Sequence, residues 1–193
     1  NGTREEHKTR PNVRIAMIML DLFSGLGGAS RDMREAGWTV IRVDNNPEFK
    51  PDVCCDIRGF KYSGPVPDLV WASPPCTEFS RRAMPPTWKC NGGKHKEPDL
   101  SLVLATKRII EEINPKWWIV ENVQGARKYF KYIFGNPVKR CGSRYLWGDF
   151  PICDPAPAFG KWELPPSPDR AALRSIIPIQ ISKAVRMSCE VYS

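Results

Sequence analysis

Apolar runs alternate with amphipathic stretches along the chain from residue 15 onward. Residues 15–23 are apolar at almost every position, which is typical of a strand buried on both faces of a parallel sheet. After a glycine-rich turn, the pattern predicts a helix over 29–38, closed by Gly37, and a second strand over 39–44. A strand, a glycine turn, a helix and a strand in this order form a βαβ unit.

The same alternation continues through the rest of the chain. Short apolar runs at 67–72, 116–120 and 145–147 predict three further strands. The clearest amphipathic helix is predicted over 101–113, and another helix over 177–190 closes the chain. This order of elements predicts an α/β fold with a doubly wound, mostly parallel sheet.

The 193 residues suit one domain. Residues 1–14 are polar and show no periodicity, so we expect a tail there and a single domain over 15–193. Many of the 19 prolines fall within 65–86 and 151–170, which predicts loops in these segments. Residues 77–99 are predicted to form a long basic loop.

Charge and cysteine content narrow the classes of function. Lys and Arg number 29 against 21 Asp and Glu, and the net charge of +8 favours a polyanionic partner, nucleic acid first. No apolar run is long enough to span a bilayer or to form a signal-peptide core. The seven cysteines lack the spacing of a zinc site, and only His7 and His95 could assist them. We therefore expect free thiols, no metal and an intracellular protein.

The motif DLFSGLGG at 21–28 lies at a predicted strand-to-helix turn. Its glycines let the backbone approach a ligand closely and leave helix N–H groups free to bind it. The next strand ends in Asp44, which could accept both hydroxyl groups of a ribose. The glycine spacing does not match the dinucleotide fingerprint, so a single-nucleoside cofactor fits better than a dinucleotide. An ordinary tight turn is the alternative.

Two further motifs lie where predicted strands end. In SPPC at 73–76, two prolines restrict the backbone before Cys76. This context suits a reactive cysteine near positive charge, whereas the other six are expected to be ordinary thiols. In WWIVENV at 117–123, Glu121 follows four apolar residues, an unfavourable place for a charge that is neither used nor paired. Asn122 could be the N-cap of a following helix.

DLFSGLGG, SPPCTEFS and ENV, in this order, resemble motifs of the cytosine-C5 DNA methyltransferases. The close resemblance covers about residues 15–126, and GSRYLWGDFP at 142–151 is similar to a segment of small phage-type members. The resemblance implies a class I S-adenosylmethionine-dependent methyltransferase with a Rossmann-like fold. It also implies DNA as the partner and a place of action in the cytoplasm or nucleoid of a bacterial or phage-infected cell.

The resemblance further implies which residues hold S-adenosylmethionine. Asp44 would take the ribose hydroxyl groups, and Asp56, followed by Ile57, would hold the adenine amino group. The implied cofactor residues are Asp21, Phe23, Ser24, Gly25, Gly27, Asp44, Asn45, Asp56, Ile57 and Pro75.

The implied chemistry needs a thiol and a carboxyl group. Carbon 5 of cytosine is a poor nucleophile, and addition of the Cys76 thiolate to carbon 6 makes it reactive towards a methyl group. Glu121, with a raised pKa, would protonate or hydrogen-bond ring nitrogen 3. Arg144 is the candidate contact for oxygen 2 of the base, and a solvated arginine facing phosphate is the alternative. Because these atoms are buried in a duplex, the cytosine would be flipped out.

The sequence departs from the family pattern in its target-recognition region, which is vestigial. Only the proline-rich residues 151–169 lie between the late motifs, too short a stretch for many major-groove contacts. We therefore expect little sequence specificity, a short recognition context, or specificity supplied by a protein partner.

Two other functions are compatible with parts of the sequence. An amino-methyltransferase acting on adenine N6 or cytosine N4 shares Ser-Pro-Pro, but it has an aromatic residue in place of Cys76. A catalytically silent nucleic-acid-binding protein would retain the fold without the reaction. The presence of both Cys76 and Glu121 argues for carbon methylation over either alternative.

Overall fold

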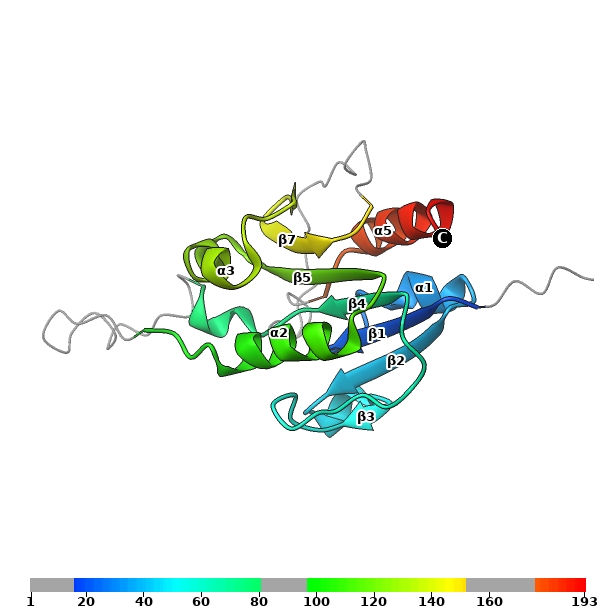
Figure 1. Cartoon of the computed structure of the whole chain (residues 1–193), viewed down its shortest axis with the longest axis horizontal. Coiled ribbons are helices and arrows are strands. Elements are labelled where there is room, and N and C mark those ends of the chain that lie inside the picture. Colours follow the sequence, from blue (N-terminus) through cyan, green and yellow to red (C-terminus); the bar gives the residue numbers. More distant parts are fainter. Residues whose placement is uncertain (1–15, 81–96, 152–175) are drawn as a thin grey trace, which may run out of the picture.

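One seven-stranded sheet runs through the centre of the computed structural model, which describes residues 16–80, 97–151 and 176–193 (Figure 1). Its strands lie in the order β3-β2-β1-β4-β5-β7-β6. The strand bounds are β1 Ile18–Leu22, β2 Thr39–Asp44, β3 Val53–Cys54, β4 Leu69–Ala72, β5 Trp117–Val123, β6 Lys139–Cys141 and β7 Arg144–Asp149.

The sheet is mostly parallel, as the sequence predicted. β1 pairs in parallel with β2 on one side and with β4 on the other, and β3 and β5 extend these pairs. β7 pairs antiparallel with both β5 and β6. Among the described strands, β7 is therefore the one that runs against the others.

Helices cover both faces of the sheet (Figure 1). Helices α2 (Ser101–Ile113) and α3 (Arg127–Phe134) lie on one face. Helices α1 (Arg31–Glu35) and α5 (Ile179–Val191) lie on the other. Short 3-10 turns are η1 Pro47–Phe49, η2 Cys76–Glu78 and η4 Gln124–Ala126. The doubly wound α/β architecture predicted from the sequence is confirmed.

Each face of the sheet has its own apolar core. Successive side chains of a strand point to opposite faces, so the continuous apolar sequence of β1 supplies both cores. Leu20 packs in the cluster that contains Ile109 of α2 and Phe130 of α3. Met19 packs in the cluster that contains Ile181 of α5. Full burial of each such side chain stabilises the fold by about 1.5–3 kcal/mol.

β5 is longer than predicted. The sequence predicted a strand over 116–120, ended by the polar residues that follow, but β5 continues to Val123. Residues 121–123 pair with residues 144–146 at the start of β7, which extends the strand. Asn122, the candidate helix N-cap, therefore lies inside a strand.

Helix α1 is shorter than predicted, and some elements were not predicted at all. α1 has five residues instead of the expected 29–38, and the chain turns at Gly37 with φ of 89°. The sequence pattern did not predict α3, β3 or β6. Predictions for 1–14, for 151–170 beyond Pro151, and for most of the basic loop 77–99 lie outside the described residues.

The chain turns towards opposite faces after β1 and after β4, which are neighbours in the sheet. β1 is followed by α1 on one face, and β4 is followed further along the chain by α2 on the other. In open α/β sheets, ligands bind at the carboxyl ends of the strands that flank such a switch point. The motifs at 21–28 and 73–76 lie at these two strand ends. No helix within the three described ranges is long and apolar enough to cross a membrane.

Candidate active site

The turn after β1 has a backbone conformation that favours glycine. Phe23, Gly25 and Gly27 have φ of 59°, 48° and 77°, all in the left-handed region. The N–H of Ser24 donates to the carbonyl of Val43 at 3.1 Å, which ties the turn to β2. Ser24 Oγ is buried and has no hydrogen-bond partner among the described residues. The turn therefore offers a buried hydroxyl group to a ligand.

Asp44 joins this turn to the end of β2. Its carboxylate accepts the N–H of Gly25 at 2.8 Å and the N–H of Asn46 at 2.9 Å. An ionised carboxylate has about four lone-pair sites, so acceptor capacity is left over. Asn45, the next residue, is exposed. The ribose contact predicted for Asp44 stays a prediction.

Arg42 is a supporting residue that the sequence analysis missed. Its guanidinium donates from β2 to the carbonyl oxygens of Gly25 and Phe49, the second at 3.0 Å. These bonds join the glycine turn to η1. A signal for this role was present, because Arg42 is a cation flanked by apolar residues two positions before Asp44.

Asp21 lies in β1, shortly before the glycine turn. It is 1% exposed, it hydrogen-bonds to the Ser30 side chain, and its Oδ2 has no partner among the described residues. Burial raises the pKa of Asp21 to about 7, although the Ser30 hydrogen bond and the charge of Arg42 lower it. Asp21 thus joins β1 to Ser30 at the start of α1, and the cofactor contact predicted for it stays a prediction.

Asp21→Asn is expected to change how stability depends on pH. The pKa of about 7 lies above the ordinary value of 3.8, so the folded protein binds this proton more tightly than the unfolded chain does. This contribution is complete below pH ~4 and is lost as the pH rises to ~7, by about 4 kcal/mol. Urea unfolding across this range should show the wild-type free energy of unfolding falling relative to that of the variant. A difference between the two proteins that is constant with pH would contradict the raised pKa.

Asp56 lies at the surface, and its carboxylate already pairs with the side chain of Arg58. Its carboxylate accepts the backbone N–H of Arg58 at 2.9 Å and also binds the Arg58 guanidinium. These hydrogen bonds lower the pKa of Asp56 to about 2. The neighbouring Ile57 is buried. A bound adenine amino group would share the Asp56 carboxylate with Arg58, and this role stays a prediction.

The residues after β4 carry Cys76 to the carboxyl edge of the sheet. η2 begins at Cys76, whose carbonyl accepts the N–H groups of Phe79 and Ser80 at 3.0 and 2.8 Å. Cys76 is exposed, whereas Cys141 and Cys189 are buried. The exposure that a nucleophile requires is therefore present at Cys76.

Asn122 fixes the loop that carries Cys76. Its Nδ2 donates to the Pro74 carbonyl at 2.9 Å, and its Oδ1 accepts the N–H of Val123 at 2.9 Å. Asn122 is 1% exposed, so both hydrogen bonds satisfy polar groups that water does not reach. The side chain positions the loop instead of capping a helix.

Glu121 and Arg144 form a buried ion pair at the end of β5. Arg144 Nη1 lies 2.9 Å from Glu121 Oε1, and the two side chains are 16% and 6% exposed. Arg144 also donates to the carbonyl of Ile176 at 2.9 Å. The burial of Arg144 and its pairing with Glu121 favour a contact inside the site over the alternative of a solvated arginine facing phosphate. The contact of Arg144 with oxygen 2 of a cytosine stays a prediction.

Ser73 binds Glu121 from the neighbouring strand end. Trp71 Nε1 donates to Ser73 Oγ at 3.1 Å, and the Ser73 hydroxyl hydrogen-bonds to Glu121. The sequence analysis included Ser73 in the SPPC motif but gave it no role. Its signal was a hydroxyl group at the end of β4, the strand beside β5.

The charged state of Glu121 affects that of Cys76. Burial raises the pKa of Glu121 above its ordinary value, and Arg144 and Ser73 offset this only in part. Desolvation raises the pKa of the Cys76 thiol above 9.0, the charge of Glu121 raises it further, and Arg144 lowers it. The described residues therefore favour the protonated thiol, and the reactivity predicted for Cys76 stays a prediction. The raised pKa predicted for Glu121 agrees with its burial.

The segment that carries Cys76 packs against α3. The ring of Phe79 lies 5.3 Å from that of Phe130 and 5.8 Å from that of Tyr129. A Cβ atom on Gly125 would overlap the carbonyl oxygen of Phe79. Glycine at this position therefore lets η4 approach the chain beside η2.

The glycine turn and the thiol follow adjacent strands, because β1 lies beside β4. A nucleoside cofactor at the turn would thus lie at the same sheet edge as Cys76 and Glu121. The arrangement combines a nucleophile, a buried acid paired with a cation, and a polar turn for a cofactor. In the described part of the chain, no group of three His, Cys, Asp or Glu side chains could hold a metal ion.

The sequence matches one protein family, described as C-5 cytosine-specific DNA methylase, over residues 17–134. Type II methyltransferase M.HindV of Haemophilus influenzae is 31% identical over 135 residues, which cover 58% of this chain and 39% of that protein. Type II methyltransferase M.HgiGI of Herpetosiphon aurantiacus is 27% identical over 132 residues, covering 58% of this chain and 94% of that protein. The chain therefore spans well under half of M.HindV.

Among solved structures, the Entamoeba histolytica methyltransferase EhMeth is similar to this chain with a TM-score of 0.47 and 18% sequence identity. The similarity covers 70% of this chain and 53% of that protein. The family match at 17–134 includes Cys76 and Glu121, and Arg144 lies beyond it.

Proposed function

The chain belongs to the C-5 cytosine-specific DNA methylase family, and from this premise we propose that it methylates carbon 5 of cytosine in DNA. One observation carries the proposal. The exposed thiol of Cys76 lies within electrostatic reach of the buried Glu121–Arg144 pair, at the sheet edge where ligands bind. Methylation of an exocyclic amino group would need no thiol there.

In the proposed reaction, Cys76 is the nucleophile. The thiol, whose pKa is raised by desolvation, first transfers its proton to water. The sulfur then forms a bond to carbon 6 of cytosine, and the electron pair of the carbon 5–carbon 6 double bond makes carbon 5 nucleophilic. Once carbon 5 is methylated, water takes the carbon 5 proton, the carbon 5–carbon 6 double bond forms again and Cys76 leaves as a thiolate. Any proton transferred to nitrogen 3 returns to Glu121.

Glu121 is proposed to act on ring nitrogen 3. Its raised pKa lets it keep a proton closer to neutral pH than an ordinary carboxyl group would. It donates that proton, or a hydrogen bond, as negative charge develops on the ring during sulfur addition. Arg144 and Ser73 hold the carboxyl group from two sides. We assign to Arg144 the contact with oxygen 2 of the base.

The residues that follow β1 and β2 fit S-adenosylmethionine, which supplies a methyl group activated by its sulfonium centre. The buried hydroxyl of Ser24 lacks a partner among the described residues, and the Asp44 carboxylate retains acceptor capacity for ribose hydroxyl groups. Eight other residues are assigned to the cofactor site, either as direct contacts or as support for the residues that make them. They are Asp21, Phe23, Gly25, Gly27, Asn45, Asp56, Ile57 and Pro75.

The proposed substrate is double-stranded DNA with the target cytosine flipped out of the stack. Carbon 5 and carbon 6 of a paired cytosine are covered by neighbouring bases, so chemistry at both atoms needs an extruded base. The net charge of +8 supports a polyanionic substrate. We propose the cytoplasm or nucleoid of a bacterial or phage-infected cell as the place of action. We further propose that the protein has little sequence specificity, reads a short recognition context, or takes its specificity from a protein partner.

Nucleoside mass spectrometry tests the proposed function. Duplex DNA is incubated with the protein and S-adenosylmethionine that carries a deuterated methyl group, and the DNA is then digested to nucleosides. The expected product is labelled 5-methylcytosine. Labelled N4-methylcytosine or N6-methyladenine would assign the protein to the amino-methyltransferases. The absence of any labelled base would favour a silent binding protein.

A further inference from the structure

The part of the chain from 124 to 148 carries charge of one sign. It contains six Lys and Arg residues and no Asp or Glu. One of the six, Arg144, pairs with Glu121. The other five lie on α3 and β6, and together with Tyr132 they are called the α3/β6 surface: Arg127, Lys128, Lys131, Lys139 and Arg140.

Helix α3 is fixed beside the proposed nucleophile. Phe79, three residues after Cys76, packs edge-on against Phe130 with ring centroids 5.3 Å apart. Phe130 is fully buried on the inner side of α3, while Lys128 and Lys131 are exposed on its outer side. The positive side chains of α3 therefore lie on an element that contacts the segment of the thiol directly.

Two further cations of this surface lie beside β7, on the same face of the sheet as α3. Arg127 and Arg140 lie over the same Tyr145 ring, 5.3 and 5.6 Å from its centroid. Tyr145 directly follows Arg144, which binds Glu121. Arg140 stands opposite Tyr145 in the β6–β7 pair. Two guanidinium groups are thus held over Tyr145, on the face of the sheet opposite to that of Arg144 and Glu121.

The charges on this surface differ from those on α2. On α2, Lys107 and Arg108 form ion pairs with Glu111 and Glu112 of the same helix. By contrast, no carboxylate within the described ranges forms an ion pair with four of the surface cations, namely Arg127, Lys128, Lys131 and Arg140. Among the described residues, these four cations therefore have no ion pair that neutralises them, and Glu97 acts on Lys128 only through its charge.

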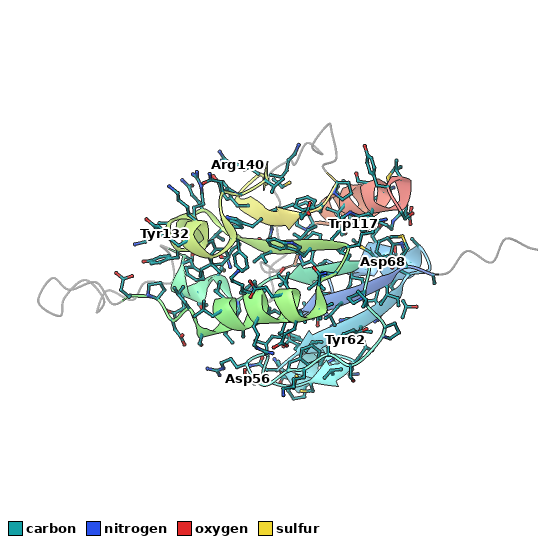
Figure 2. All side chains as sticks on the ribbon, viewed as in Figure 1. Asp56, Tyr62, Asp68, Trp117, Tyr132 and Arg140 are labelled. Atoms are coloured by element: carbon teal, nitrogen blue, oxygen red, sulfur yellow. The ribbon has the colours of Figure 1, made fainter. Side chains whose placement is uncertain are left out.

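The α3/β6 surface also presents an exposed aromatic ring. Tyr132 is 87% exposed, and Figure 2 shows Tyr132 and Arg140 projecting outward from the molecule. Clustered cations with an aromatic side chain among them and no carboxylate are typical of a surface that contacts nucleic acid.

From this placement we propose that the α3/β6 surface binds the phosphate backbone of the DNA beside the target cytosine. The inference rests on the proposed function, because it takes DNA as the occupant and Cys76 as the point where the base enters. Phosphate contacts position a protein on a duplex without reading its sequence. The surface would thus hold the DNA in register with the thiol whatever the neighbouring bases are.

The double variant Lys128→Gln/Lys131→Gln tests this surface. Its matched control is Lys61→Gln/Lys183→Gln, which removes the same charge from exposed lysines elsewhere. Binding of the full chain to a cytosine-containing duplex is measured by fluorescence anisotropy over a series of salt concentrations. Each lost phosphate contact lowers the slope of log K against log salt by about 0.9. We expect the α3 variant to lose about 2 units of slope and the control to keep the wild-type slope.

The possible outcomes test the proposed DNA-binding surface and the proposed methylation independently. A reduced slope for the α3 variant alone supports the surface, and label on carbon 5 of cytosine supports the proposed function independently. Equal slopes for the two variants, or no binding of the duplex by the wild type, overturn the surface even if methylation occurs. A reduced slope without any methyl transfer overturns the proposed function and leaves a nucleic-acid-binding surface. Thermal unfolding of both variants should match the wild type, because all four lysines are exposed.

Discussion

Cys76→Ser is expected to lower the rate of methyl transfer by on the order of 10⁴-fold or more. A serine hydroxyl is a much weaker acid than a thiol, and the desolvation that raises the pKa of Cys76 would disfavour an alkoxide further. The rate is measured in single turnovers with labelled S-adenosylmethionine. Trapping on a duplex with 5-fluorocytosine adds a direct readout, because fluorine at carbon 5 prevents the loss of a proton and holds the adduct. The wild type should form this adduct and the variant should not.

Cys54→Ser is the matched control for the loss of an exposed thiol. Cys54 is also exposed, and it lies at the end of the edge strand β3. This variant should keep both the rate and the adduct. An adduct that persists in Cys76→Ser would assign the bond to carbon 6 to another residue. Loss of the adduct in both variants would point to a general effect of thiol removal.

The sequence predicted well those elements whose own pattern of apolar and polar residues shows which side chains are buried. The predicted bounds 39–44 and 101–113 agree with β2 and α2. β3 has two residues and exists through the pairing of Val53 with Val43, which no local pattern shows. Residues 127–134 mix cations with aromatic and β-branched side chains of modest helix propensity. They form α3 because Phe130 packs against Phe79 and the sheet.

The candidate site could be predicted only as separate residues. Cys76 and Glu121 each stand where a strand ends, which local sequence can show. Arg144 meets Glu121 across 23 positions of sequence because β7 enters the sheet antiparallel to β5. The roles of Ser73 and Asn122 also depend on which strand lies beside them. Residue type and spacing therefore identified the candidate reacting groups. The order of the strands in the sheet determines which residues contact and support these groups.

The charge of Glu121 changes how readily the Cys76 thiol ionises. A charged Glu121 raises the pKa of the thiol, while Arg144 lowers it. A protonated Glu121 relieves this repulsion and leaves the charge of Arg144 acting on the sulfur. The state that favours a thiolate is therefore the same state that holds a proton for ring nitrogen 3. Removing the Glu121 charge should then have opposite effects on the thiol and on the reaction.

Glu121→Gln is expected to lower methyl transfer by about 10²- to 10⁴-fold, the usual contribution of a general acid. At the same time it should lower the pKa of Cys76, because the charge that raises it is gone and Arg144 remains. The wild-type rate should rise with pH as the thiol ionises and fall as Glu121 loses its proton. The variant should lose the dependence of the rate on the Glu121 carboxyl group and keep only a rise that follows ionisation of the thiol. Single-turnover rates and the alkylation rate of Cys76 by iodoacetamide, each measured against pH, report the two effects separately.

Glu78→Gln is the matched control, since Glu78 lies on the same 3-10 turn as Cys76 and its charge is not among the causes of the thiol's shift. It should leave the alkylation midpoint and the bell-shaped profile unchanged. Slower methyl transfer in Glu121→Gln with an unchanged or higher alkylation midpoint would mean that the substitution disturbed the loop at 73–76. If Glu121 donates the proton, Glu121→Gln should show slower methyl transfer together with a lower pKa of the Cys76 thiol. A lower rate of methyl transfer with a higher rate of Cys76 alkylation therefore distinguishes proton donation by Glu121 from support of the loop.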